Sequence, residues 1–131
     1  QCAPACHPLR DPEALQRPHG AKVVVDRRGR ALYFSRAPIP SGALFDGARA
    51  FRHVGVYAFR RDVLARFSKL PRTPLEMAEQ LEQLRALEHG MTIAAVETRH
   101  ATVGVDVPAD IKNVERFVEE SLDSTHGSKT T

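Results

Sequence analysis

The chain has 131 residues, of which 42% are hydrophobic and 27% are charged, and its formal net charge is +3. This length and apolar fraction suit one compact domain, or part of a larger one. No apolar stretch approaches the ~20 residues that span a membrane, and the N-terminal residues lack the apolar core of a signal peptide. The basic residues form no stripe with interleaved aromatic residues, so composition also argues against a nucleic-acid-binding module.

Residues 1–20 hold four of the nine prolines, and we expect this segment to be irregular. It contains Cys2 and Cys6, but their spacing is not Cys-x-x-Cys and no second cysteine pair follows. With His7 and His19 nearby, a zinc site is one interpretation. We favour the simpler one, two reduced thiols of a cytosolic protein. The chain does not begin with methionine, so we expect it to be a partial product.

The rest of the chain predicts a mixed α/β pattern with hairpins instead of a regular βαβ alternation. A tight turn around Arg28-Gly29 joins the first two predicted strands. The tail 122–131 is rich in Ser and Thr, and we expect it to be disordered, so that residues 1–121 form the folded part. In chain order, the expected elements are strands 22–26, 31–36 and 51–59, helices 61–68 and 73–90, a strand 92–97 and a helix 108–120.

The segment 73–90 carries the clearest helical signals. Thr73 and Glu76 have capping-box spacing, and Pro74 suits the first helical position. Gly90 can adopt the left-handed conformation that ends a helix. At about 100° per residue, one face is apolar and the other is polar. The apolar face comprises Met77, Leu81, Leu84 and Leu87, and the opposite face comprises Glu79, Glu82 and Ala86.

Four groups of sequence strings follow one another along the chain. They are Lys22-Val-Val-Val-Asp26 with Ala31-Leu-Tyr-Phe-Ser-Arg-Ala37, then Arg52-His-Val-Gly-Val-Tyr57, Leu81-Glu-Gln-Leu-Arg85 and Gly104-Val-Asp-Val-Pro-Ala-Asp110. In order and separation they closely resemble the C-terminal half of the CMP-Kdo synthetase family, the 3-deoxy-manno-octulosonate cytidylyltransferases, over residues 7–120. The resemblance implies an α/β, nucleotide-diphospho-sugar transferase-like mixed sheet with flanking helices. This chain would supply only its C-terminal, sugar-binding and dimer-forming portion.

The activity implied by this resemblance is transfer of CMP from CTP to the sugar acid Kdo, with release of pyrophosphate, in lipopolysaccharide biosynthesis. The family also implies Mg²⁺ as cofactor and a cytoplasmic homodimer with contacts around residues 37–60. The family's Gly-rich CTP loop belongs to its N-terminal half and is absent from this sequence, so we expect this fragment alone to be inactive. Two alternatives stay open: a cytidylyltransferase for another acidic sugar, such as a sialic acid, and a non-catalytic remnant that folds or pairs without binding CTP.

Asp106 is the candidate catalytic and metal-binding residue. Its position before a Pro-started helix is typical of a simple N-cap. The resemblance implies instead a Mg²⁺ ligand, because the family carries an Asp here in a Gly-Val-Asp-Thr-Pro-Glu-Asp run and Mg²⁺ prefers hard oxygen ligands. Val107 and Ala109 replace the family's Thr and Glu. Loss of the capping hydroxyl costs about 1 kcal/mol of local stability.

The candidate sugar-binding residues are Glu82, Gln83, His53, Tyr57 and Arg36. Spacing alone makes Glu82 and Gln83 surface residues, and places His53 and Tyr57 on one face of their strand. The resemblance implies that the first pair contacts sugar hydroxyls, for which a carboxylate and an amide are suited. It also implies that His53 and Tyr57 line the same pocket. Arg36 is by default a solvated charge, but its family match lies near the substrate, where a guanidinium can bind a carboxylate through two hydrogen bonds.

Overall fold

The computed structural model describes residues 2–10, 12–17, 20–41, 50–99, 105, 108 and 110–126, with side chains described as far as residue 119. The chain divides into two compact units, residues 1–100 and 101–131. The expected mixed α/β class is confirmed, because the first unit combines a five-stranded sheet with short helices. In the described part of the chain, no helix is both long and apolar enough to cross a membrane.

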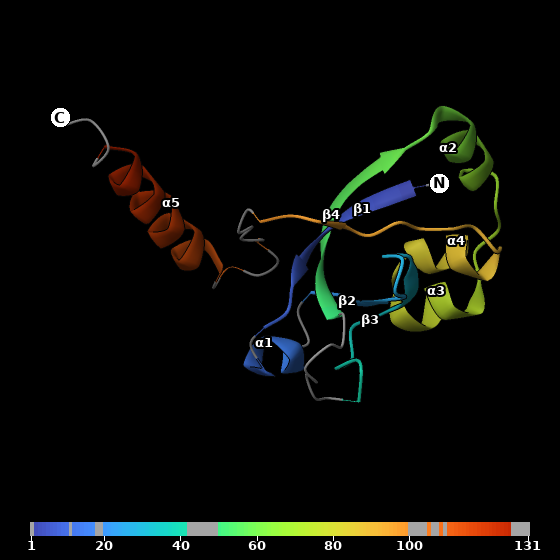
Figure 1. Cartoon of the computed structure of the whole chain (residues 1–131), viewed down its shortest axis with the longest axis horizontal. Coiled ribbons are helices and arrows are strands. Elements are labelled where there is room, and N and C mark those ends of the chain that lie inside the picture. Colours follow the sequence, from blue (N-terminus) through green and yellow to red (C-terminus); the bar gives the residue numbers. More distant parts are fainter. Residues whose placement is uncertain are drawn as a thin grey trace. The chain divides into compact units, whose positions relative to one another are not determined.

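The sheet has the strand order β3-β2-β4-β1-β5. Figure 1 labels β1, β2, β3 and β4. All neighbouring strands pair antiparallel except β1 and β5, which are parallel. The central β4 is ten residues long, and its first residues pair with both β2 and β1, while its C-terminal half pairs with β1. The strands are β1 (Cys2–Pro8), β2 (Lys22–Val25), β3 (Ala31–Ser35), β4 (Ala50–Phe59) and β5 (Val96–Glu97).

The β2–β3 hairpin confirms the prediction of two strands joined by a tight turn. Gly29 adopts a φ of 77°, which a residue with a Cβ rarely tolerates. Asp26 stabilises the turn, because its Oδ1 accepts hydrogen bonds from the backbone N–H groups of Arg28 and Arg30, at 2.8 and 2.9 Å. The prediction of strand 92–97 is confirmed only in part. Regular pairing is limited to β5, and Ile93 and Ala94 form isolated bridges.

The N-terminal segment was expected to be irregular, and this prediction was wrong. Residues Cys2–Pro8 form β1, which lies between β4 and β5, and Pro12–Gln16 form α1. The prolines concealed the strand, because proline has no N–H to donate and is uncommon within a sheet. The pairing of β1 with β4 shifts its register between Pro4 and Cys6, an irregularity that allows Pro4 to lie inside the sheet.

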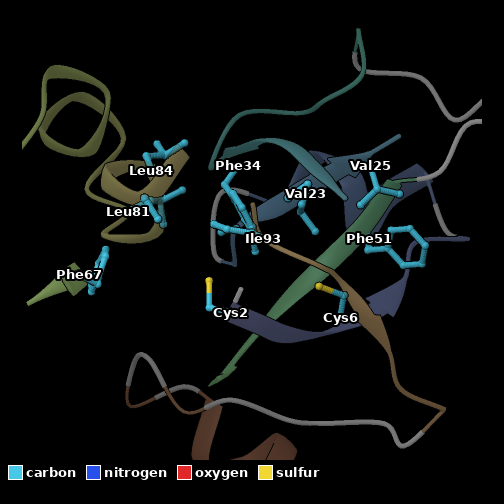
Figure 2. Packing of buried hydrophobic residues seen from close by; sticks show 13 residues of the cluster. Cys2, Cys6, Val23, Val25, Phe34, Phe51, Phe67, Leu81, Leu84 and Ile93 are labelled. Atoms are coloured by element: carbon cyan, nitrogen blue, oxygen red, sulfur yellow. The ribbon is translucent and has the colours of Figure 1, made fainter. Parts of the chain in front are cut away.

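The core is built around β1, β2, β3 and the helical segment that follows α2 (Arg61–Phe67), a helix that the sequence predicted. Cys6, Val23, Phe34, Leu84 and Ile93 are all completely buried. Figure 2 shows that Leu81 and Leu84 extend from the helical segment toward Phe34 and Ile93. Both cysteines of β1 are buried free thiols. Burial raises the pKa of Cys6 to about 12, so this thiol stays protonated and unreactive.

The segment 73–90 does not form the single helix that we expected. It contains α3 (Pro74–Glu79) and α4 (Gln83–Glu88), and Gln80 between them is left-handed, with φ 54° and ψ 43°. Gly90 also has a positive φ, 71°, as expected for the residue that ends the second helix. A non-glycine residue in this conformation costs about 1 kcal/mol, so other contacts must stabilise the break.

The break determines which side chains reach the core. Leu81 and Leu84 are 7% and 0% exposed, as the apolar face predicted. Ala86, which we expected on the polar face, is only 1% exposed, whereas Met77 of the expected apolar face is 50% exposed. One continuous helix would bury Met77 together with Leu81 and Leu84, and would expose Ala86. Because the chain changes direction at Gln80, the buried face differs from the predicted one.

An ion pair between Glu76 of α3 and Arg85 of α4 spans this break. Glu76 is 3% exposed, and Arg85 donates to its two carboxylate oxygens from Nε and Nη2, at 2.8 and 2.6 Å. The Thr73 backbone N–H also donates to Glu76, at 3.3 Å, which is the glutamate half of the predicted capping box. Hydrogen bonds from Arg85, together with those from Thr73 and Arg72, lower the pKa of Glu76 to about 2.

The second unit contains α5 (Asp110–His126), where we expected a helix over 108–120. This helix continues to His126, into the tail that we expected to be disordered from residue 122. Residues 127–131 lie outside the described ranges. Val105 and the α5 residues Ile111 and Val118 are exposed apolar side chains.

Replacement of Glu76 by Gln should destabilise the chain by about 3 kcal/mol at pH 7, because the largely buried Arg85 guanidinium then loses its buried counter-ion and keeps only the exposed Glu82. The folded pKa of Glu76 is about 2, below its ordinary value of 4.5. Its stabilising contribution is therefore complete above the ordinary pKa and is lost as the pH falls toward the folded one. Urea unfolding followed by circular dichroism should show the gap between wild type and variant narrowing from pH 7 to pH 3.

The control for this measurement is Asp62→Asn, which breaks an exposed ion pair between Asp62 and Arg60, 3.5 Å apart. Such pairs contribute less than about 1 kcal/mol. A loss of stability in Asp62→Asn as large as that in Glu76→Gln would contradict a special role for the buried pair.

Replacement of Gln80 by Gly should give a more stable chain than replacement by Ala, by about 1 kcal/mol. Both variants remove the hydrogen bond from Gln80 Nε2 to the Met77 carbonyl, so their difference isolates the backbone conformation. Thermal unfolding of the two variants measures this difference. Equal stability would show that the left-handed conformation at this position is not strained.

Candidate sugar-binding pocket

A pocket of about 480 Å³ is lined by side chains from β1, β4, α2 and the α4 region. Its lining contains both apolar and polar side chains. The apolar residues are Cys2, Phe59, Leu64, Phe67 and Ala86. The polar residues are Tyr57, Ser68, Glu82, Gln83 and Arg85. A wall of this kind suits a small ligand with one apolar side and several hydroxyl groups.

The structure brings together three of the residues that the sequence identified as sugar-binding candidates. Tyr57 from β4 lines this pocket, as do Glu82, which precedes α4, and Gln83, the first residue of α4. The break at Gln80 starts α4 at this position and places its first residues at the pocket. Glu82 has a side chain that is 68% exposed, whereas Gln83 is 8% exposed. The pocket therefore offers one accessible carboxylate beside a buried amide.

The Gln83 amide is an unused hydrogen-bond donor. Its Nε2 is buried and has no hydrogen-bond partner among the described residues. A buried polar group without a partner is destabilising, so such groups are uncommon unless they serve a function. Tyr57 lines the same pocket, and burial raises the pKa of the Tyr57 hydroxyl, which remains protonated. Both side chains can therefore donate a hydrogen bond to a ligand oxygen.

A row of aromatic rings runs from the core to the pocket. Phe34 and His53 meet edge to face at 5.6 Å, and His53 and Tyr57 are 5.1 Å apart, which confirms that the latter two share a strand face. Tyr57 stacks on Phe59 at 5.8 Å, and Phe59 lies 5.9 Å from Phe67. This row fixes Tyr57 from both sides.

His53 contacts the pocket only through Tyr57, because the histidine itself is not a lining residue. Burial lowers the pKa of His53 to about 4, so its ring is neutral at physiological pH. Its Nε2 is buried without a hydrogen-bond partner in the described part of the chain. The ring can therefore accept or donate one hydrogen bond, but it carries no positive charge toward a ligand.

Arg36 lies elsewhere, in a group of contacts that joins β3 to α3. Its backbone N–H donates to the Glu79 carboxylate at 3.0 Å, and its Nε donates to the Glu79 carbonyl at 3.2 Å. The Glu79 carboxylate also accepts a hydrogen bond from the Ser35 hydroxyl at 2.7 Å. The Arg36 carbonyl accepts a hydrogen bond from the buried Lys22 at 2.7 Å. These contacts are structural, and Arg36 is not among the residues that line the pocket.

Asp106, the predicted Mg²⁺ ligand, lies outside the described residues. Within the described ranges, no three His, Cys, Asp or Glu side chains cluster in a way that could hold a metal ion. The predicted metal site therefore stays a prediction.

Seven of the ten lining residues were not site candidates from the sequence: Cys2, Phe59, Leu64, Phe67, Ser68, Arg85 and Ala86. Arg85 belongs to the same Leu-Glu-Gln-Leu-Arg string as Glu82 and Gln83, but an arginine three residues after a glutamate on a helix usually indicates only a surface pair. That pair exists, with Nη2 of Arg85 3.3 Å from Glu82 Oε1. Phe67 and Cys2 come from segments far away in the sequence, and only folding brings them to the pocket.

Comparison with known proteins agrees with the family resemblance. A 3-deoxy-manno-octulosonate cytidylyltransferase from Solibacter usitatus is 46% identical over 119 residues, which cover 87% of this chain and 46% of that protein. A protein of the same name from Syntrophotalea carbinolica is 50% identical over 117 residues, or 82% of this chain and 47% of that protein. The chain thus spans about half the length of the relatives that it matches.

The fold comparison leads to the same group of proteins. The solved structure of a CMP:2-keto-3-deoxy-manno-octonic acid synthetase complexed with CTP matches with a TM-score of 0.78 and 41% sequence identity, over 92% of this chain and 49% of that one. The nucleotidyltransferase-like mixed sheet that the sequence predicted is therefore confirmed. The family model described as cytidylyltransferase matches residues 3–93, more than half of the sequence. This chain belongs to the cytidylyltransferase family.

Proposed function

We propose that the protein to which this chain belongs transfers CMP from CTP to 3-deoxy-manno-octulosonate, with release of pyrophosphate, and that the pocket described above binds the sugar acid. The observation that carries this proposal is the convergence of Tyr57, Glu82 and Gln83 on one pocket. Glu82 and Gln83 were identified together from one string, whereas Tyr57 came from a separate string and lies on a different element, β4. The names of the similar proteins support the same substrate.

The polar part of the pocket suits a polyhydroxylated ligand. The Glu82 carboxylate can accept hydrogen bonds from hydroxyl groups, and the Gln83 amide can donate one. A pocket with buried polar groups discriminates against sugars that lack the matching hydroxyl, because the protein groups would then stay unpaired. The apolar residues Leu64 and Phe67 can pack against the apolar face that the C–H groups of the sugar form.

Phosphoryl transfer of this kind depends on positioning. The anomeric hydroxyl of the sugar must lie in line with the α-phosphate of CTP, and the protein has little covalent chemistry to perform. Glu82, Gln83 and Tyr57 would hold the sugar in this orientation. The neutral His53 would support the Tyr57 ring, which it contacts at 5.1 Å.

The proposal includes Mg²⁺, with Asp106 as one of its ligands. A carboxylate supplies the hard oxygen that Mg²⁺ prefers, and Mg²⁺ is commonly bound through one or two carboxylates plus phosphate oxygens and water. When bound, the ion would offset the negative charge of the nucleotide phosphates. The support for Asp106 is its sequence string, since the residue is not described by the structure.

We also propose that the whole protein is a cytoplasmic homodimer, with contacts from the region around residues 37–60. The family resemblance supports the homodimer. The need for CTP supports the cytoplasmic location. In β4, which belongs to this region, Val56 is 67% exposed and available for such a contact.

Replacement of Glu82 by Ala should weaken binding of 3-deoxy-manno-octulosonate to this chain about tenfold, because a hydrogen bond to a charged group contributes about 1.5–3 kcal/mol. Isothermal titration calorimetry with the sugar, with and without CTP and Mg²⁺, measures the change. Asp62→Ala is the matched control, because Asp62 is an equally exposed carboxylate of α2 that does not line the pocket. Absence of sugar binding by the folded wild-type chain would contradict a sugar site contained in this chain.

Replacement of Gln83 by Leu should lower sugar affinity and leave the stability of the free chain unchanged or raised by about 1 kcal/mol. The reason is that Leu has a similar volume and removes a buried amide N–H that lacks a partner. Urea unfolding and calorimetric titration of the same variant provide the two values. A loss of stability together with unchanged affinity would show that Gln83 is structural.

A further inference from the structure

We propose that Arg85 is a positioning residue of the pocket, which holds the Glu82 carboxylate and the Phe67 ring in place and is itself anchored by Glu76. This inference deepens the proposed function, because it concerns how the same pocket is prepared for a hydroxylated sugar acid. Nothing in the sequence pattern assigned Arg85 to the pocket, since a glutamate and an arginine three residues apart on a helix usually form an ordinary surface pair.

The anchor is the buried carboxylate of Glu76. Two hydrogen bonds, 2.8 and 2.6 Å long, connect it to Nε and Nη2 of Arg85. Glu76 and Arg85 have side chains that are 4% and 13% exposed, so little water competes with this contact. A planar guanidinium that donates hydrogen bonds to both oxygens of one carboxylate has almost no rotational freedom.

Arg85 uses this fixed position to contact two lining residues. Its Nη2 lies 3.3 Å from Oε1 of Glu82, and its Cζ lies 5.1 Å from the centre of the Phe67 ring. The second contact is a cation–π interaction, which favours one arrangement of the ring. Glu82, Phe67 and Arg85 all line the pocket, whereas Glu76 does not.

The Glu82 side chain needs such support. It is 68% exposed, and an exposed glutamate samples several rotamers. Fixing those rotamers when a ligand binds costs up to about 2 kcal/mol. A contact that already restricts Glu82 in the free chain reduces this loss, which is the general benefit of preorganisation. The charge of Arg85 is meanwhile largely offset by Glu76, so positioning fits this residue better than direct capture of the sugar carboxylate.

The test is a double-mutant cycle on binding of 3-deoxy-manno-octulosonate, measured by calorimetry with the folded chain. Arg85→Lys keeps the charge but cannot form the two-pronged contact with Glu76. We expect it to weaken binding about fivefold in the wild-type background and less than about twofold in the Glu82→Ala background, because coupled residues are not additive. Equal losses in both backgrounds would overturn the proposal, since a general structural defect acts independently of Glu82.

Arg72→Lys is the matched control. Arg72 also donates to Glu76, at 3.3 Å, but its side chain is 61% exposed and does not line the pocket. This variant weakens a contact with the same carboxylate, and we expect its sugar affinity to stay within about twofold of wild type. A loss equal to that of Arg85→Lys would show that any weakening of the Glu76 contacts is sufficient, which contradicts a specific role for Arg85.

A measurement without ligand separates this proposal from the proposed function. Three-bond NMR couplings report whether the Glu82 side chain occupies one χ1 rotamer or averages over several. We expect one dominant rotamer in the wild type and in Arg72→Lys, and averaging in Arg85→Lys. Averaging already present in the wild type would overturn the positioning role. A single rotamer in a chain that does not bind the sugar would contradict the proposed ligand and leave the positioning role supported.

Discussion

The structure around the pocket depends on the buried carboxylate of Glu76. A charge that is 3% exposed must be paired, and its partner Arg85 lies on the next helix. The two side chains can meet only because Gln80 leaves the helical conformation between them. The same change of direction turns Leu84 into the core and starts a new helix at Gln83, beside the pocket. One electrostatic requirement thus couples the helix break, the core and the site.

A second set of contacts fixes the helical segment on the sheet. Glu79, the last residue of α3, accepts hydrogen bonds from the Ser35 hydroxyl and the Arg36 backbone, both at the end of β3. The aromatic row connects the sheet to α2, because Phe59 of β4 lies against both Tyr57 and Phe67. Hydrogen bonds thus hold α3 on the sheet, and ring contacts hold α2 on it. Of these two groups of contacts, the aromatic one lines the pocket, through Tyr57, Phe59 and Phe67.

The mixture of apolar and polar side chains in the pocket lining follows from this construction. Its apolar residues continue the hydrophobic core, since Phe67 and Cys2 belong to both. Among its polar residues, a buried amide and an exposed carboxylate lie next to each other at the start of α4. A cytidylyltransferase that acts on a sugar acid needs such a surface to orient one hydroxyl among many. This chain contains the proposed sugar-binding pocket. The binding of CTP and Mg²⁺ and the dimer are proposed for the whole protein.

The sequence by itself determined the β2–β3 hairpin and the strand β4, because turn residues and period-two alternation are local signals. It also brought Glu82 and Gln83 together as candidates, through a short string that resembles the family. Tertiary structure alone decided the rest. β1 was concealed by its prolines, and it forms a strand because β4 and β5 supply pairing on both sides. The helix break at Gln80 and the ion pair of Arg85 with Glu76 depend on burial of a carboxylate. Local periodicity cannot reveal that burial, because it results from packing between segments that are distant along the chain.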